Sequence, residues 1–449
     1  MKNVYFIGIG GIGMSALARY FKFKGYGVSG YDRTPSDLTA ALQKEGIGVH
    51  FNPDVDMIPK DMAETLVVYT PAIPEDFPEL SFVRNEGYRL VKRSRTLGEI
   101  AAGQSCIAIA GTHGKTTTST LSAHIFTEAG DGCSAFLGGI SKNYGTNMLV
   151  SHTPIVVAEA DEFDRSFLQL FPEIAVITAI DADHLDIYGD YDHVLEAFRA
   201  FAGQVSGALI LHTGLPVGPS DTKAKIYSYS FDDATADFHA EHPRTDELGH
   251  CVYDLVWPGG TLEGVRVGIP GRVHGENSIA AAATALLKGL DPEKVRKAIG
   301  SFHGVQRRMD IRFNAPGLTY IDDYAHHPEE LSATISSIRG MFPGRKITAV
   351  FQPHLFTRTR DFAPEFARSL SLVDKLILLD IYPAREEPIP GVTSEIIFKD
   401  VTAPEKLMLR KDELVEYLSK EKLDILVTFG AGDIDRLCAP IAEMLAEKK

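Results

Sequence analysis

The chain has 449 residues, of which 44% are hydrophobic and 23% are charged, and its formal net charge is -15. At roughly 150 residues per domain, this length predicts about three domains rather than one hydrophobic core. The composition is typical of a folded, water-soluble protein and excludes a disordered or fibrous one. Because the charge is negative and no basic stretch contains interleaved aromatic residues, we expect no nucleic-acid partner.

The cysteines and the apolar segments favour a cytoplasmic location. The four cysteines are dispersed without a C-x-x-C pair, so the sequence predicts neither a zinc site nor a disulfide framework. The N-terminus enters an apolar strand without a signal-peptide pattern, and no run of about 18 apolar residues could span a membrane. We therefore expect a cytoplasmic protein without a membrane partner.

A glycine-rich turn, G-x-G-G-x-G at residues 8–13, separates a predicted strand at 4–7 from a predicted helix at 14–24. Asp32 ends the next predicted strand, at a spacing from the glycines that is typical of dinucleotide-binding units. In such units backbone N–H groups hold a diphosphate and the acid holds a ribose hydroxyl. The motif predicts binding of a diphosphate-bearing nucleotide, and NAD is one option among several.

A second strand-to-helix turn has the pattern of a phosphate-binding loop. The apolar residues 106–110 lead into Gly111-Thr112-His113-Gly114-Lys115-Thr116-Thr117, and a helix is predicted from about residue 117. Backbone N–H groups would hold phosphate oxygens, Lys115 would reach the terminal phosphates of ATP, and the Thr116 hydroxyl would bind Mg²⁺. The loop is shorter than the usual pattern, with Ile109 where a glycine is expected. A chance glycine-rich turn is the alternative, but consecutive threonines begin a helix poorly without a ligand.

A carboxylate and a histidine follow the next two predicted strands. Glu159 ends the apolar stretch 155–159, and His184 follows the stretch 174–179. Since the carboxyl ends of parallel strands meet at one edge of a sheet, Glu159 and His184 could hold a second divalent ion beside the loop. The alternative is a solvated or hydrogen-bonded histidine, which is the commoner role of such a residue.

The rest of the chain predicts a small antiparallel segment and a third α/β unit. Alternating apolar residues at 251–256 predict antiparallel strands, and the alanine-rich residues 277–287 predict a buried helix. Strands and helices then alternate, which implies a third parallel sheet. Its strands are predicted at 318–321, 347–351, 375–379 and 425–428.

Two polar clusters follow strands of this third sheet. The stretch Asp322-Asp323-Tyr324-Ala325-His326-His327-Pro328 follows one strand, and His354 with Arg358 and Arg360 follows another. Both clusters would lie at the same edge of the sheet. Paired arginines can clamp a carboxylate or a phosphate, although an arginine at an exposed helix start is commonly just solvated.

Together these stretches resemble the Mur ligase family of peptidoglycan synthesis. The resemblance rests on stretches that occur in the family's order, namely GIGGIGM, GTHGKTTT, EADEFDRSFL, DADHLDIYGD, GRVHGENSIAA, QRR, DDYAHHPEE and FQPHLFTRTRD. It implies an α/β fold of three domains: an N-terminal Rossmann-like domain, a central P-loop ATPase-like domain with a mostly parallel sheet, and a C-terminal Rossmann-like domain. We expect a UDP-sugar-binding domain at 1–98, an ATP-binding domain at 99–303 and an amino-acid- and ATP-contacting domain at 304–449.

The resemblance also implies roles for individual residues. The UDP-sugar would be bound by Gly10, Gly11, Ile12, Gly13, Asp32 and, as a weaker candidate, Arg93. ATP would be bound by Gly111, Thr112, His113, Gly114, Lys115, Thr116, Thr117, Asn277, Arg308 and Asp323. The catalytic set would be Lys115, Glu159, His184, His326, His327, His354 and Arg358. Thr116 would hold one Mg²⁺, and Glu159 with His184 would hold a second, with Mn²⁺ as a substitute.

The reaction that the resemblance implies joins L-alanine to the carboxylate of UDP-N-acetylmuramic acid through an acyl phosphate made with ATP. Each of the three histidines of the third unit is a candidate base for the alanine amine. Several sister ligases carry a carbamoylated lysine after the His184 position, and the absence of any lysine between His184 and Ala208 favours the alanine-adding branch. Leu355 stands where some members have arginine, which speaks against a two-arginine clamp on the alanine carboxylate.

Other functions remain open from the sequence. A ligase that adds a preformed murein peptide to the same sugar acid shares the phosphate loop and the Asp-Asp-x-x-His-His pattern. An NAD-dependent oxidoreductase would use the first glycine turn but leaves the loop at Lys115 unexplained. A P-loop regulatory ATPase would hydrolyse ATP independently of any amino acid. The sequence is compatible with a monomer or a homodimer.

Overall fold

The chain folds into α/β units built on mostly parallel sheets. The computed structural model describes residues 1–181, 185–247, 249–384 and 386–448. By its contacts the chain divides into two compact units, one of residues 1–269 and 274–305 and one of residues 270–273 and 306–449. The predicted α/β class is confirmed, and the predicted domain limits after residues 98 and 303 stay a prediction.

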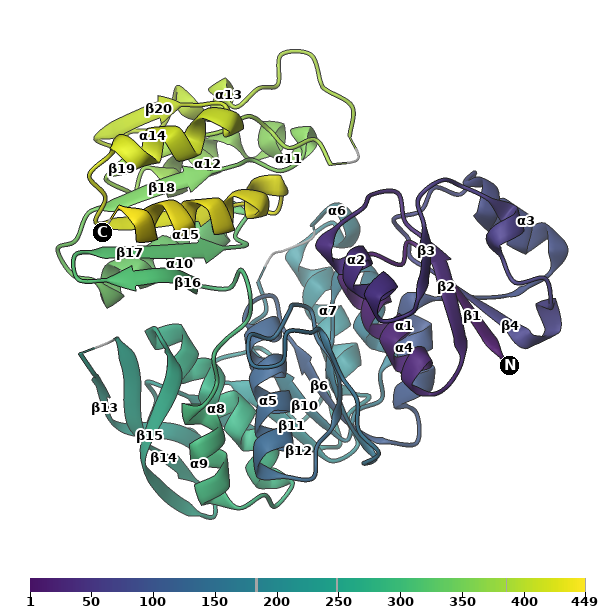
Figure 1. Ribbon diagram of the computed structural model, residues 1–449. Helices are drawn as coiled ribbons and strands as arrows, with labels where there is room; N and C mark the ends of the chain where they lie inside the picture. The colour runs from purple at the N-terminus through teal and green to yellow at the C-terminus, as the bar shows by residue number, and fades with distance from the viewer. Residues whose placement is uncertain (182–184, 248, 385, 449) are drawn as a thin grey trace. The chain divides into compact units, whose positions relative to one another are not determined.

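The first sheet has the strand order β3-β2-β1-β4-β5, with parallel pairing throughout the described strands. Its strands are β1 (Asn3–Ile7), β2 (Gly27–Tyr31), β3 (Gly48–His50), β4 (Thr65–Tyr69) and β5 (Arg89–Lys92). Its helices are α1 (Ile12–Phe23), α2 (Asp37–Lys44), α3 (Pro78–Glu86) and α4 (Arg93–Ala101), with the short 3-10 helices η1 (Val55–Met57) and η2 (Met62–Glu64). Since alternate strand residues point to opposite faces, Val4 and Phe6 pack with α1 and α2, whereas Tyr5 and Ile7 pack with α3. Helices α1 and α2 thus lie on one side of the sheet and α3 on the other (Figure 1).

The second sheet has the order β15-β14-β13-β12-β11-β10-β6-β9-β7-β8. Its strands are β6 (Ser105–Ala110), β7 (Ser134–Phe136), β8 (Met148–Leu149), β9 (Ile155–Glu159), β10 (Ile174–Ile177), β11 (Ala208–His212), β12 (Lys225–Ser230), β13 (Phe238–Thr245), β14 (His250–Trp257) and β15 (Gly260–Pro270). Its helical elements are α5 (Lys115–Ala129), η3 (Phe163–Gln169), α6 (Leu185–Tyr188), α7 (Tyr191–Ala202), α8 (Arg272–Leu287) and α9 (Pro292–Gly300). The strands from β9 through β6 to β13 are parallel, and the antiparallel pairing of β13 with β14 confirms the prediction at 251–256.

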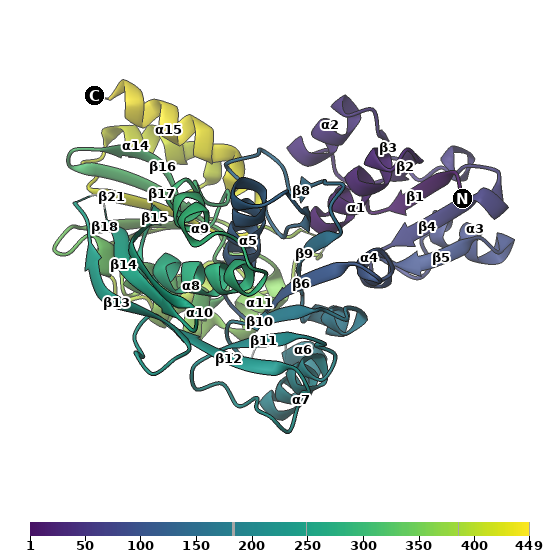
Figure 2. The ribbon, with the colours of Figure 1, turned by 90° about the horizontal axis from the view of Figure 1, so that it is seen from below.

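The first two sheets share one hydrophobic core. Residues of α1, α7 and one face of the second sheet belong to a single buried cluster. The half-buried Tyr20 of α1 packs against this cluster, with its ring 5.5 Å from that of Phe136. Figure 2 shows β8 beside α1, although the two elements are far apart in the sequence. The opposite face of the second sheet is covered by α5, α8 and α9. This continuous core explains why the two sheets belong to one compact unit.

The third sheet has the order β16-β17-β21-β18-β19-β20. Its strands are β16 (Asp310–Ala315), β17 (Leu318–Asp323), β18 (Ile347–Phe351), β19 (Lys375–Leu378), β20 (Glu405–Met408) and β21 (Ile425–Phe429). Its helices are α10 (Pro328–Met341), α11 (Phe356–Asp361), α12 (Ala363–Leu370), α13 (Glu395–Phe398), η4 (Lys411–Glu413), α14 (Leu414–Lys420), η5 (Asp433–Leu437) and α15 (Cys438–Glu447).

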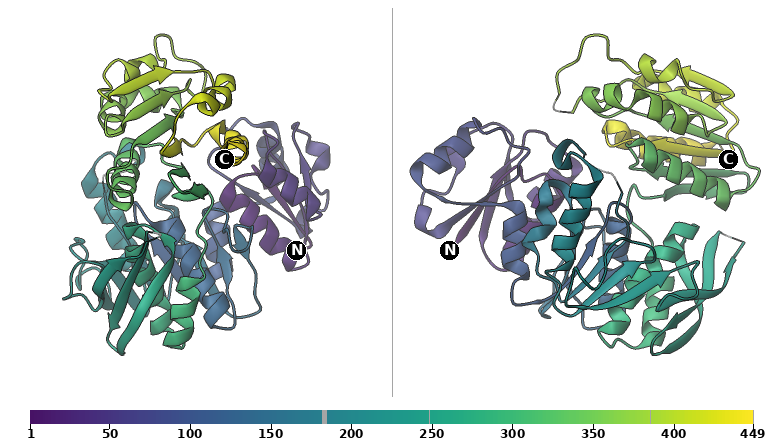
Figure 3. Two further views of the ribbon diagram at one scale, coloured as in Figure 1. Left: turned by 60° about the vertical axis from the view of Figure 1, so that its left-hand side comes forward. Right: turned by 180° about the vertical axis from the view of Figure 1, so that it is seen from behind.

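Helices cover both faces of the third sheet. Helices α10, α12 and α13 pack on one face, and α14 and α15 pack on the other (Figure 3). Only β16, which pairs with β17, is antiparallel among the described pairs of this sheet. Within the described residues, no helix is long and apolar enough to cross a membrane.

His274, on α8, provides a test of burial beside the second sheet. Its side chain is 4% exposed, and its Nδ1 has no hydrogen-bond partner among the described residues. Burial lowers the pKa of this imidazole to about 4, so the unfolded chain binds its proton at a higher pH than the folded chain does. The contribution of His274 to the free energy of unfolding should therefore fall as the pH falls from about 6.5 towards 4.

We expect His274→Leu to reduce the pH dependence of stability. Between pH 7 and pH 5, wild type should lose about 2 kcal/mol more of its free energy of unfolding than the variant does. Denaturant titrations of both proteins at the two pH values measure this difference. The contributions of the carboxylates to the pH dependence cancel, because both proteins have the same carboxylates. Parallel losses in the two proteins would contradict the prediction.

Candidate functional site

The loop of residues 111–117 has a backbone that only glycine fits at its start. Gly111 follows β6 with a φ of 132°, and a Cβ there would lie 2.1 Å from Thr178 Oγ1. Gly114 has a φ of 80° and directly precedes α5. Both are regions of φ that favour glycine over any other residue. The N-terminus of α5 therefore opens onto a tight loop whose N–H groups can bind an anion.

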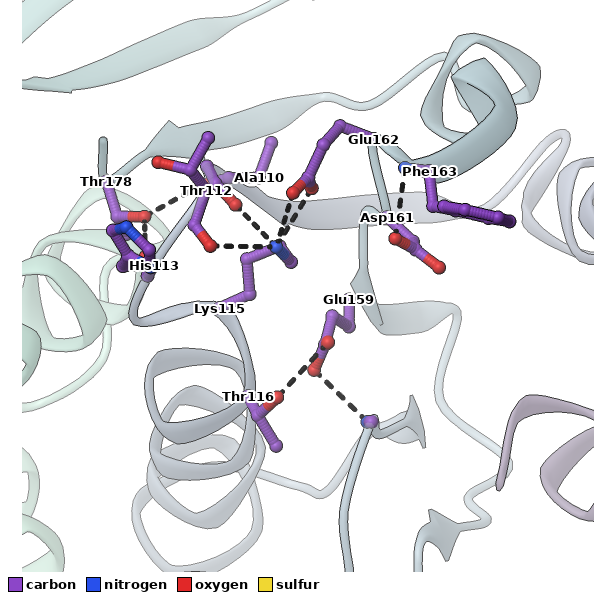
Figure 4. A network of polar contacts seen from close by, with 12 residues as sticks. Ala110, Thr112, His113, Lys115, Thr116, Glu159, Asp161, Glu162, Phe163 and Thr178 are labelled. Atoms are coloured by element: carbon purple, nitrogen blue, oxygen red, sulfur yellow. Dashed lines mark hydrogen bonds and ion pairs between the residues drawn. The ribbon is translucent and has the colours of Figure 1, made fainter. Parts of the chain in front are cut away.

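Lys115 is folded over its own loop (Figure 4). Its Nζ donates to the carbonyl oxygens of Gly111 at 2.6 Å and Thr112 at 3.3 Å, and to a carboxylate oxygen of Glu162 at 2.9 Å. Burial acts to lower the pKa of Lys115, but the carboxylates of Glu162, Asp161 and Glu159 outweigh burial and raise it. The ammonium group therefore stays charged, as binding of a phosphate requires.

Thr116 and Glu159 meet at the carboxyl edge of the sheet. Thr116 Oγ1 donates to Glu159 Oε1 at 3.1 Å, and the backbone N–H of Gly138 donates to Glu159 Oε2 at 3.2 Å (Figure 4). A hydroxyl and a carboxylate oxygen are ligands that Mg²⁺ accepts, so this pair fits the predicted metal. Within the described residues, no three His, Cys, Asp or Glu side chains form a metal cluster, and His184 lies outside them.

The other predicted residues of this loop have local partners. Thr112 Oγ1 donates to Asp181 Oδ2 at 2.8 Å, and His113 Nε2 lies 3.4 Å from the same oxygen. Thr117 is buried in α5. Asn277 of α8 lies beside the loop, because a Cβ at Gly114 would come within 2.9 Å of Asn277 Oδ1. The fold thus brings Asn277 to the loop across more than 150 positions of sequence.

The first glycine turn is closed by the acid that the spacing predicts. The backbone N–H of Gly10 donates to Asp32 Oδ2 at 2.7 Å, and a Cβ at Gly10 would meet that oxygen. Gly11 is the N-cap of α1, and Ile12 is its first residue. The turn is therefore shaped by Asp32 itself, whose other oxygen accepts from the N–H of Thr34 at 3.1 Å.

Arg93 lies between the first glycine turn and Asp161. A Cβ at Gly13 would come within 2.4 Å of an Arg93 guanidinium nitrogen, and Arg93 Nη2 lies 3.4 Å from Asp161 Oδ2. A cavity of about 100 Å³ joins these groups, and its wall includes Ile12, Gly13, Arg93, Gly138, Glu159 and Asp161. The cavity thus connects the first glycine turn to the carboxylate beside the phosphate loop.

In the second unit, Asp323 is a buried carboxylate at the end of β17. It accepts from the N–H groups of Met309 at 2.7 Å and Ala325 at 2.9 Å. Burial raises the pKa of Asp323 to about 6. The positive charge of the Arg308 guanidinium acts against this shift.

The three candidate histidines do not form one group. The rings of His326 and His354 lie 6.0 Å apart, whereas the ring of His327 packs 4.9 Å from that of Phe362. Burial lowers the pKa of His326 and outweighs the Glu330 carboxylate, which lies 3.3 Å from Nδ1 and acts to raise the pKa, while the positive charge of Arg358 acts in the same direction as burial. His326 and His354 therefore lie close together, and the lowered pKa of His326 favours the neutral imidazole that a base requires.

Sequence reasoning missed three residues that the structure brings to the site. Glu162 is the partner of Lys115, Asp161 faces Arg93, and Gly138 donates to Glu159. For Glu162 and Asp161 a signal was present, because both belong to the acidic stretch that begins at Glu159. For Gly138 the sequence carries no comparable signal.

Three family models match consecutive parts of the chain. The Mur ligase family catalytic domain matches residues 3–105, the Mur ligase middle domain matches residues 109–285, and the Mur ligase glutamate ligase domain matches residues 307–432. The chain is also 49% identical over 453 residues to a UDP-N-acetylmuramate–L-alanine ligase of Porphyromonas gingivalis, covering 99% of each protein. It is 46% identical to the protein of the same name from Flavobacterium psychrophilum, covering 100% of this chain and 99% of that protein.

Solved structures agree with these relatives. A UDP-N-acetylmuramate–alanine ligase of Thermotoga maritima superposes with a TM-score of 0.84 at 26% identity, covering 100% of both chains. A murein peptide ligase of Psychrobacter arcticus shares the fold with a TM-score of 0.71 at 21% identity, covering 99% of both chains. On these matches, which cover almost the whole chain, the protein belongs to the Mur ligase family.

Proposed function

We propose that this enzyme joins L-alanine to the carboxylate of UDP-N-acetylmuramic acid with consumption of ATP, in the synthesis of peptidoglycan precursors. The names of relatives at 49% and 48% identity support the substrate pair. The observation that carries the proposal is the cavity that connects the first glycine turn to Glu159. A nucleotide-sugar bound at that turn could extend its carboxylate towards the phosphate loop.

A carboxylate does not condense with an amine in water until one of its oxygens becomes part of a leaving group. Transfer of the terminal phosphoryl group of ATP to the sugar's carboxylate gives an acyl phosphate and ADP. The N–H groups of residues 111–117 would hold the phosphates of ATP, and Lys115 would offset their charge. Attack by the amine of alanine on the acyl carbon then gives a tetrahedral intermediate that expels phosphate and leaves an amide.

Thr116 and Glu159 are the residues that would hold Mg²⁺, since their oxygens already lie 3.1 Å apart beside the loop. When bound, the ion would neutralise negative charge on the transferring phosphoryl group. A second ion at Glu159 and His184, with Mn²⁺ as a substitute, remains part of this proposal.

Residues of the second unit are assigned to the amine. Arg358 would bind the carboxylate of alanine, and His326 or His354 would take the proton of its ammonium group. His326 is the better base, because its lowered pKa keeps it neutral near pH 7. His327, whose ring packs on Phe362, is the weakest of the three. Arg308, Asp323 and Asn277 complete the proposed set of ATP contacts.

The rival within the family is a ligase that adds a preformed murein peptide to the same sugar acid. The murein peptide ligase of Psychrobacter arcticus has the same fold at only 21% identity, so it supports the fold and not the substrate. A cytoplasmic location and either a monomer or a homodimer are further parts of the proposal.

An assay with different amine substrates tests the choice between the two ligases. The protein is incubated with UDP-N-acetylmuramic acid, ATP, Mg²⁺ and one of L-alanine, glycine, L-serine or a murein tripeptide. We expect phosphate release with L-alanine and a product, identified by mass spectrometry, that carries one added alanine. Phosphate release only with the tripeptide would establish the rival, and release without any amine would indicate an ATPase.

The charge of Lys115 should be needed for chemistry but not for binding of the nucleotide-sugar. We expect Lys115→Ala to lower kcat by about a thousandfold or more, because the cation of the phosphate loop that would offset charge on the transferring group is lost. Calorimetry should show an unchanged affinity for UDP-N-acetylmuramic acid. Lys420→Ala, which removes an exposed lysine, is the control and should behave as wild type. Equal loss of activity and sugar binding in a folded Lys115 variant would contradict this separation.

A further inference from the structure

One loop of the central domain contacts the first glycine turn and Glu159 at the same time. This loop, residues 137–147, connects β7 to β8. Its two ends are held together, because the N–H of Leu137 donates to the carbonyl oxygen of Asn147 at 3.0 Å. The residue at one end, Asn147, reaches α1, and the residue next to the other end, Gly138, reaches Glu159.

Asn147 is completely buried and is bonded at both ends of its amide. Its Nδ2 donates to the carbonyl oxygen of Ile12 at 2.5 Å and to Ser15 Oγ at 3.0 Å, both in the first turn of α1. Its Oδ1 accepts from the guanidinium of Arg19, which also forms an ion pair with Glu45 at 2.8 Å. The amide orientation is therefore fixed by a donor on one side and acceptors on the other. Neither a carboxylate nor an alkyl group can make this set of bonds.

The other end of the loop is packed tightly against the phosphate site. A Cβ at Gly138 would lie 2.3 Å from Glu159 Oε2, and a Cβ at Gly139 would lie 2.6 Å from Val305 and 3.1 Å from the Thr116 methyl group. This end of the loop therefore packs closely against both Glu159 and Thr116, with no room for a side chain between them. A continuous series of contacts thus runs from Ile12 through Asn147 and Gly138 to Glu159.

The two ends of this series are walls of one cavity. Ile12 and Gly13 line the cavity on the side of the glycine turn, and Gly138 and Glu159 line it on the side of the phosphate loop. We propose that Asn147 is a positioning residue for the sugar substrate, which sets the separation between the nucleotide-sugar turn and the Thr116–Glu159 pair. This inference rests on the proposed function, because it gives the cavity the carboxylate of the sugar acid as its occupant.

A second asparagine of the same loop offers a matched control. Asn143 donates through Nδ2 to the carbonyl oxygen of Ser301 at 2.8 Å and accepts from the N–H of His303 at 2.8 Å. Both hydrogen bonds of its amide join the loop to the segment after α9, and neither joins it to α1. Loss of Asn143 therefore perturbs the loop without releasing the glycine turn.

The experiment compares Asn147→Ala, Asn147→Asp and Asn143→Ala with wild type. For each protein, calorimetry measures the affinity for UDP-N-acetylmuramic acid and for a non-hydrolysable ATP analogue with Mg²⁺, and steady-state kinetics gives kcat and each KM. Thermal unfolding reports whether the variants are folded.

We expect both Asn147 variants to bind the sugar nucleotide about tenfold more weakly, which corresponds to about 1.4 kcal/mol. Affinity for the ATP analogue should stay within about twofold, because the phosphate loop keeps its own contacts. Asn147→Asp should resemble Asn147→Ala, since the aspartate lacks the donor. Asn143→Ala should keep the sugar affinity of wild type.

Several results would overturn the inference. These are an unchanged sugar affinity in Asn147→Ala, equal losses for sugar nucleotide and ATP analogue, or a wild-type affinity in Asn147→Asp. If wild type turns over alanine and the Asn147 variants bind UDP-N-acetylmuramic acid with wild-type affinity, this inference is wrong and the proposed function stands. Wild-type protein that neither binds the sugar nucleotide nor uses it would refute the proposed function as well.

Discussion

The ammonium group of Lys115, whose side chain is only 14% exposed, determines how the carboxyl edge of the central sheet is organised. A charge in a protein interior needs an opposite charge close by, and here Glu162, itself 1% exposed, lies 2.9 Å away. Glu162 can lie beside Lys115 because β9 runs parallel to β6. The segments that follow the two strands therefore begin at the same edge of the sheet. In the proposed reaction the phosphates of ATP would compete with Glu162 for the same ammonium group.

The same parallel arrangement places the Thr116 hydroxyl against Glu159 and brings Asn277 beside Gly114. The edge of this sheet therefore brings together the Lys115 ammonium group, the carboxylates of Glu159 and Glu162, and the backbone N–H groups of the phosphate loop. The first glycine turn lies outside that sheet, and it joins the site only because α1 shares a core with the central domain. Asn147 adds a polar contact to this apolar junction at the point where the two loops approach the cavity.

The sequence predicted those features that depend on residues close together along the chain. The glycines at 8–13 and 111–114 indicated strand-to-helix turns because few other residues adopt the required backbone, and the spacing to Asp32 matched the distance of one βαβ unit. The alternation at 251–256 likewise predicted antiparallel pairing. The sequence did not distinguish His326 from His327, because adjacent residues differ in role only through the direction of their side chains. Packing turns the ring of His327 onto Phe362 and the ring of His326 towards His354.

By itself, the sequence determined the α/β class, the two glycine turns and the order of the motifs, because local backbone preference and hydrophobic periodicity act over short stretches. Only the tertiary structure decided that Lys115 pairs with Glu162, that Asn277 lies beside Gly114, and that Asn147 bonds to Ile12. Each of these contacts joins residues of different strands, helices or loops, so it depends on strand order and helix packing, which no short stretch of sequence specifies. The loop at residues 111–117 could therefore be recognised from its sequence pattern. Its connection to the first glycine turn could be seen only in the tertiary structure.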